Sequence, residues 1–130
     1  MATYLLDTDV IIDTLRGRRR RVQLLGRLAR EGHAFACCGV NITEVYAGMR
    51  PEEEAPTRAF LEGLFFCPLS REIATWAGLL KRDWAKKGVT LAVADVTVAA
   101  TALANGLTLL TGNRRHYPMP ELQLFALPTE

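Results

Sequence analysis

Apolar and polar positions follow two different periods along the chain. Short apolar runs predict strands, and these cover residues 3–6, 34–38, 65–69, 107–111 and 122–127. Elsewhere apolar residues recur at helical spacing, which predicts a helix ending near residue 15 and helices over 18–30, 41–50, 53–64, 70–87 and 95–104. Strands alternating with helices are typical of an α/β domain, with a mainly parallel sheet of four or five strands covered by helices on both faces.

The composition fits one domain spanning residues 1–130. A 49% hydrophobic and 23% charged chain can form a core, and these values exclude collagen-like and highly charged disordered classes. Asp7, Asp9 and Asp13 fall where a signal peptide would be apolar, so we expect a cytoplasmic protein. Residues 96–113 carry no charge, but Asn105–Gly106 interrupts them. We therefore expect no membrane span.

The cysteines and histidines argue against a zinc or disulfide framework. Cys37, Cys38 and Cys67 form no CxxC pair, and only His33 and His116 are present. A zinc site of the usual type would therefore lack ligands. Any catalytic metal would be bound by carboxylates, which favours Mg²⁺ or Mn²⁺.

Four polar residues lie where predicted strands end or the next helices begin. These are Asp7, Glu44, Asp95 and Asn113. Ligands bind open parallel sheets at this edge, although residues so far apart in the chain can meet only through folding. Converging carboxylates repel one another unless a cation lies between them. A divalent cation there can activate water for attack on a phosphodiester.

Helix capping is the alternative role for these acids. Asn41 and Glu44 have the spacing of a capping box, and Asp95 stands at a predicted helix start. Asp95 lies on the apolar stripe of its helix, which favours an inward position. Glu44 lies opposite its own stripe, beside the small Ala47, so helix geometry supports it less.

Four segments of the chain resemble one enzyme family in order and spacing. The segments are LLDTDVIID, NITEVYAGMR, VADVTVAATALANGLTLLTGN and RRHYP. Together they resemble the PIN-domain ribonucleases, most closely the VapC toxins of bacterial VapBC toxin–antitoxin pairs. The likeness spans nearly the whole chain and implies a three-layer α/β/α PIN-like domain.

The resemblance also implies a site, a cofactor and partners. Asp7, Glu44 and Asp95 match the acidic metal-binding positions of the family, and Asn113 matches a fourth position, where an amide can coordinate or orient water. The implied activity is Mg²⁺- or Mn²⁺-dependent RNA cleavage by a homodimer. A cognate VapB-like antitoxin would block the active site.

Residues beside these positions have less specific expectations. Asp9 departs from the Ser or Asn common in the family; we interpret it as the cap of the first helix, the alternative being added charge near the metal. Thr8 fits an ordinary turn or a hydrogen bond to the site. His116 fits packing or hydrogen bonding better than general-acid chemistry. Trp76 and Trp84 fall on an apolar stripe, which favours core or dimer contacts.

The arginines carry the strongest charge pattern in a chain of net charge +2. The run Arg16 and Arg18–Arg21 favours either contact with RNA or the antitoxin, or a solvated face. Arg114 and Arg115 follow Asn113 directly and are well placed to meet RNA phosphates.

Two other functions fit part of the sequence. Residues 5–9 end a strand with a DxD pattern, as in phosphotransferases of the haloacid-dehalogenase type. The match then fails, because Ile11 stands where a Thr or Val would be expected and no later acidic pair supports the metal. The second alternative is a catalytically silent module that binds RNA or a partner, against which the intact Asp7, Glu44 and Asp95 argue.

Overall fold

The computed structural model describes residues 1–127 as alternating strands and helices. The strands are β1 (Thr3–Leu6), β2 (Ala34–Cys38), β3 (Phe65–Cys67), β4 (Thr108–Thr111) and β5 (Leu124–Ala126). The helices are α1 (Thr8–Leu15), α2 (Arg19–Arg30), α3 (Gly39–Gly48), α4 (Glu54–Glu62), α5 (Arg71–Lys86) and α6 (Val93–Asn105). Two 3₁₀ turns, η1 (Pro51–Glu53) and η2 (Arg114–His116), complete the described elements.

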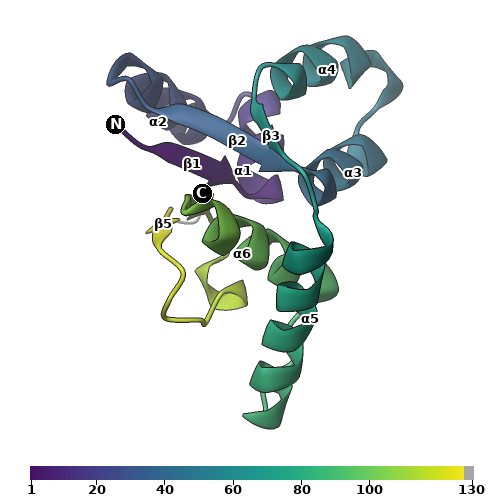
Figure 1. Cartoon of the computed structure of the whole chain (residues 1–130). Coiled ribbons are helices and arrows are strands. Elements are labelled where there is room, and N and C mark those ends of the chain that lie inside the picture. The colour runs from purple at the N-terminus through teal and green to yellow at the C-terminus, as the bar shows by residue number, and fades with distance from the viewer. Residues whose placement is uncertain (128–130) are drawn as a thin grey trace.

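All five strands form one parallel sheet in the order β3-β2-β1-β4-β5. Helices α1–α4 lie on one side of this sheet and α5 and α6 on the other (Figure 1). The predicted three-layer α/β/α architecture is therefore confirmed. Because the strands are parallel, their carboxyl ends meet at one edge.

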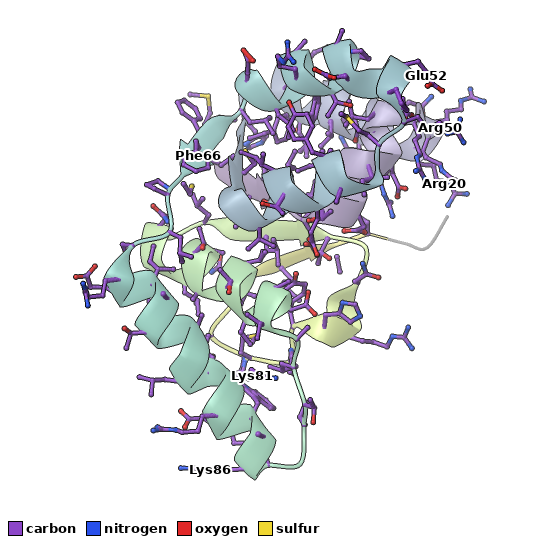
Figure 2. All side chains as sticks on the ribbon, turned by 90° about the vertical axis from the view of Figure 1, so that its right-hand side faces the viewer. Arg20, Arg50, Glu52, Phe66, Lys81 and Lys86 are labelled. Atoms are coloured by element: carbon purple, nitrogen blue, oxygen red, sulfur yellow. The ribbon has the colours of Figure 1, made fainter. Side chains whose placement is uncertain are left out.

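The outer strands are shorter than the sequence predicts. β3 ends at Cys67 because Pro68 follows, and proline has no N–H to donate to a neighbouring strand. Phe65 and Phe66 of this edge strand are 66% and 55% exposed, and Figure 2 shows Phe66 at the outside of the molecule. β5 begins at Leu124 rather than at residue 122, because Leu122 is buried in the core from a turn.

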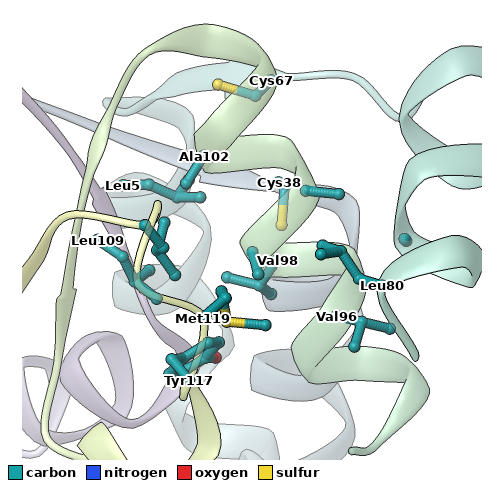
Figure 3. Close-up of a cluster of buried hydrophobic side chains, with 14 of the residues drawn as sticks. Leu5, Cys38, Cys67, Leu80, Val96, Val98, Ala102, Leu109, Tyr117 and Met119 are labelled. Carbon is teal, nitrogen blue, oxygen red and sulfur yellow. The ribbon is translucent and has the colours of Figure 1, made fainter. Parts of the chain in front are cut away.

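The central strands divide their side chains between two cores. Leu5 lies in register with Leu109, and both face the core under α5 and α6 (Figure 3). The next pair, Leu6 and Leu110, faces the core under α1–α4. All four leucines are 0% exposed. The period of two in a strand thus anchors a helical layer on each face.

Helix starts differ from prediction in ways that affect the site. α3 begins at Gly39, earlier than the predicted Asn41, so Asn41 lies inside its first turn. The Asn41 side chain accepts a hydrogen bond from the Cys38 backbone N–H at 2.9 Å, so the predicted capping box with Glu44 is wrong. α6 begins at Val93, which places Asp95 in its first turn.

The remaining composition-based expectations concern the cysteines, the tryptophans and the uncharged segment. Cys37, Cys38 and Cys67 are buried free thiols. Trp84 packs against the core under α5 and α6, whereas Trp76 is 39% exposed.

Gly106 ends α6 with a φ of 64°, so the uncharged segment divides into a helix and a strand as predicted. Among the helices of residues 1–127, none has the length and apolarity needed to cross a membrane.

Candidate active site

Three acids approach the carboxyl edge of the sheet from different elements. Asp7 follows β1 directly and caps α1, where its Oδ1 accepts a hydrogen bond from the Thr8 backbone N–H at 2.9 Å. Glu44 extends from α3, the helix after β2, and Asp95 extends from the first turn of α6. The alternation of strand and helix brings these distant residues to one edge.

The side chain of Asp7 is held more firmly than that of a helix cap exposed to solvent. Its side chain is only 6% exposed. Its Oδ2 accepts hydrogen bonds from the Thr111 hydroxyl at 2.8 Å and from the Tyr117 hydroxyl at 2.9 Å. Both carboxylate oxygens therefore have donors, which fixes the orientation of the group.

A chain of hydrogen bonds fixes the exposed Glu44. The Thr8 hydroxyl donates to Glu44 Oε1 at 2.6 Å, and it accepts a bond from Asn41 Nδ2 at 3.0 Å. Asn41 is 0% exposed and is anchored by the Cys38 backbone N–H. Thr8 thus makes a hydrogen bond to a predicted site residue, which is one of the two roles expected for it. Through Thr8, the buried Asn41 links Glu44 to the end of β2.

The environment of Asp95 shows that the three acids interact. Burial raises the pKa of the Asp95 carboxyl, and the negative charges of Asp7 and Glu44 raise it further. His116 lowers that pKa, since its Nδ1 lies 3.5 Å from Asp95 Oδ2. His116 is therefore a polar neighbour of Asp95, and its predicted packing or hydrogen-bonding role stays a prediction.

The donor chemistry of this cluster suits a hard divalent cation. Asp7, Glu44 and Asp95 offer only carboxylate oxygens, which Mg²⁺ and Mn²⁺ prefer. Within residues 1–127, no group of three His, Cys, Asp or Glu side chains is close enough to enclose an ion. Mg²⁺ keeps several water ligands and needs only one or two direct carboxylates, so the residues fit such an ion without forming a closed cage.

Asn113 lies on a cavity of about 840 Å³ whose acidic lining residues are Asp9 and Asp13 rather than Asp7, Glu44 or Asp95. Its backbone N–H donates to Thr111 Oγ1 at 2.9 Å, the same hydroxyl that donates to Asp7. The exposed Arg114 and Arg115 also line this cavity. The structure therefore connects Asn113 to Asp7 through Thr111 and places the two following arginines around one opening.

Asp9 does not cap α1, contrary to prediction, because Asp7 occupies the cap position. Asp9 Oδ2 instead accepts a hydrogen bond from the Gly112 backbone N–H at 2.9 Å. Burial, and then the charge of Asp7, raise the pKa of Asp9 to about 6, whereas Gly112 and Arg21 lower it. Its carboxylate therefore joins α1 to the loop after β4.

The basic run divides into exposed and buried members. Arg16 and Arg18–Arg20 are exposed, and Arg18 lines the cavity. Arg21 also lines it but is only 4% exposed. For most of the run, exposure fits both predicted roles, a solvated face and contact with RNA or the antitoxin, whereas Arg21 is buried.

Sequence reasoning missed Thr111 and Tyr117 as partners of the site. Thr111 is a polar residue that ends an apolar strand at 0% exposure, and that position is the signal that could have revealed it. The Tyr117 ring lies in the core shown in Figure 3, while its hydroxyl reaches Asp7. Burial raises the pKa of Tyr117 strongly, so the hydroxyl remains a proton donor.

Known proteins of the same fold and length resemble this chain. Residues 4–122 match the PIN-domain family. Ribonuclease VapC19 of Mycobacterium tuberculosis is 34% identical over 120 residues, which cover 92% of this chain and 96% of that protein. Ribonuclease VapC2 of Haemophilus influenzae is 27% identical over 135 residues, covering 100% and 98% of the two chains.

Solved structures agree with this relationship. A toxin–antitoxin complex from Klebsiella pneumoniae contains a chain with a TM-score of 0.78 and 26% identity, covering 98% of each chain. A chain in the DNA-bound VapBC2 complex of Rickettsia felis has a TM-score of 0.84 at 22% identity, covering 95% of this chain and 98% of that one, and supports the fold alone. The chain belongs to the PIN-domain family and, within it, to the VapC ribonucleases.

Proposed function

We propose that this protein is a Mg²⁺- or Mn²⁺-dependent endoribonuclease and the toxin of a type II toxin–antitoxin pair. Asp7, Glu44 and Asp95 are the proposed metal ligands, and Asn113 is the proposed fourth site residue. The observation that supports this most is the position of the three acids: Asp7 directly follows β1, Glu44 of α3 accepts a hydrogen bond from the adjacent Thr8, and Asp95 lies in the first turn of α6. Carboxylates that repel one another at the edge of a sheet form a site that a cation stabilises.

Each residue has a distinct task in this proposal. A bound divalent cation would supply an activated water and stabilise the oxygens of the phosphodiester. Thr111 and Tyr117 hold the Asp7 carboxylate in one orientation, and Thr8 holds Glu44. Asn113 would orient water without adding charge.

The family match over residues 4–122 argues against the phosphotransferase alternative. The hydrogen bonds of Asp7 do not separate the two roles. Its Oδ1 accepts only from the Thr8 N–H among the described residues, so this oxygen keeps a lone pair that either a cation or a phosphorus atom could use.

Chelation tests the proposed metal dependence. We expect cleavage of total RNA by the purified protein with Mg²⁺ or Mn²⁺, and none after a chelator is added. Circular dichroism should not change, because two cores formed by the sheet and its helices stabilise the fold without metal. Cleavage that persists in chelator would contradict the metal site, and RNA that binds uncut would support the silent binding module.

Arg114 and Arg115 are expected to bind RNA phosphates at the cavity. Replacing both by Ala should weaken RNA binding and reduce the slope of log K against log salt by about 1.4, since each single-strand phosphate contact contributes about 0.7. The affinity can be measured in an Asp95→Asn background to prevent cleavage. Arg71 and Arg82, exposed on α5, supply the control double variant. An unchanged slope would exclude the first pair from phosphate contact.

The proposed partners follow from the same assignment. Toxin–antitoxin complexes among the solved relatives support a VapB-like antitoxin that blocks the acidic edge. We also propose a homodimer that acts on RNA in the cytoplasm. Copurification with the product of an adjacent open reading frame, with loss of RNA cleavage in the complex, would support the antitoxin.

A further inference from the structure

Arg21 is a buried cation in an otherwise exposed basic run. It lies in the first turns of α2 and is 4% exposed, whereas its neighbour Arg20 is exposed and lies at the surface in Figure 2. Its Nε lies 3.3 Å from Asp13 Oδ2 on α1. A buried guanidinium loses much of its hydration, so nearby carboxylates must compensate it.

Asp9 is a second carboxylate near this cation, since the ends of both side chains approach Gly112. Its Oδ2 accepts from the Gly112 N–H, while its Oδ1 is buried and has no hydrogen-bond partner among residues 1–127. A carboxylate in this state depends on a nearby positive charge more than on hydrogen bonds. Asp13 depends less on the charge of Arg21, because its side chain is 25% exposed and also lies 4.0 Å from Arg18 Nε.

Gly112 is the point at which the two side chains meet the end of β4. A Cβ added at Gly112 would lie 2.5 Å from Asp9 Oδ2 and 2.9 Å from Arg21 Nη2. Both side chains therefore approach Gly112 closely, and a larger residue at this position would force at least one of them to move. Three elements, α1, α2 and the end of β4, are joined here.

The residues that we propose to contact RNA follow Gly112 directly in the chain. Asn113, Arg114 and Arg115 are exposed and line the cavity together with Asp9 and Arg21. We propose that Arg21 is a positioning residue: by compensating the buried Asp9 carboxylate, it keeps Gly112 bonded to Asp9 and so fixes Asn113–Arg115 for RNA. This inference rests on the proposed ribonuclease function.

The identity of residue 9 gives the inference a specific consequence. An Asn at position 9 could accept from the Gly112 N–H without a cation nearby, because its amide is neutral. Asp9 and Arg21 should therefore behave as a coupled pair, whose separate and joint replacements are not additive. Removing the cation alone leaves an uncompensated buried charge.

A double-mutant cycle tests this coupling. Arg21→Gln should raise KM for a cleaved RNA oligonucleotide about tenfold or more, because small displacements of positioning groups are costly. Adding Asp9→Asn should restore KM to within about twofold of Asp9→Asn alone. Arg82→Gln, which removes the same charge from an exposed position on α5, should change KM by less than about threefold.

Amide exchange supplies a measurement that does not depend on RNA. Protection of the Gly112 N–H should fall in Arg21→Gln and return in the double variant. If Arg21→Gln does not fold, the double variant compared with Asp9→Asn still decides the matter. A double variant with raised KM or an unprotected Gly112 would overturn the role of Arg21. Protein that cleaves no RNA yet shows the exchange pattern would refute only the proposed function.

Discussion

Replacing Asp95 by Asn is expected to reduce metal-dependent RNA cleavage by about 10²–10³-fold. A metal ligand contributes several kcal/mol of transition-state stabilisation, and each 1.36 kcal/mol corresponds to about tenfold in rate. The fold should survive. Burial and neighbouring charges raise the pKa of Asp95, so its charged form is less favourable in the folded than in the unfolded protein. Without metal, the neutral amide should therefore raise the free energy of unfolding at neutral pH.

Asp7 requires a different substitution for the same test. Asp7→Ala would leave the buried Thr111 and Tyr117 hydroxyls without their acceptor, and each such loss costs about 1–3 kcal/mol. Asp7→Asn retains a carbonyl oxygen that can accept from them. We expect it to lose activity as Asp95→Asn does, with a smaller loss of stability than Asp7→Ala.

The measurement is the initial rate of RNA cleavage with saturating Mg²⁺, beside urea unfolding of each metal-free variant. Asp83→Asn is the matched control, since Asp83 is exposed on α5 and pairs with Arg82. It should cleave RNA at the wild-type rate. Full activity in both Asp95→Asn and Asp7→Asn would refute the proposed ligands.

The sheet and its helices were predictable because local patterns determine them. Leu5 and Leu6 face opposite cores, and this two-sided burial produces the uninterrupted apolar run from which β1 was predicted. Asp7 could be placed at the functional edge for the same reason, since it follows that run. Strand ends were less predictable, as at β5, where Leu122 enters the core from a turn.

Contacts between distant residues lie beyond such patterns. Asp9 resembles a helix cap in the sequence, yet it bonds Gly112 across the fold. Asn41 resembles the first residue of a capping box with Glu44, yet it completes a box with Cys38 instead, and its Nδ2 donates to Thr8 on another helix. Short polar side chains serve equally at helix starts and in buried networks, so only the folded geometry separates these roles.

The bond from Thr8 to Glu44 leads to the second large expected effect. Thr8→Val preserves side-chain shape but removes the hydroxyl, which frees Glu44 and leaves Asn41 Nδ2 without its acceptor. Groups that orient metal ligands typically contribute about 10–100-fold in metal affinity or activity. We expect the Mg²⁺ concentration for half-maximal cleavage to rise by about that factor. Thr8→Ser, which restores a hydroxyl, should recover most of the loss.

Asn41→Ala extends the same argument into the core. It removes the acceptor of the buried Cys38 N–H, so the free energy of unfolding should fall by about 1–3 kcal/mol. The Mg²⁺ concentration for half-maximal cleavage should rise as it does in Thr8→Val. Thr75→Val removes a hydroxyl that donates to the Arg71 carbonyl on α5 and should change neither quantity strongly. If Thr8→Val left the Mg²⁺ response unchanged, Glu44 would not depend on Thr8 for its position, and the buried Asn41 would serve stability alone.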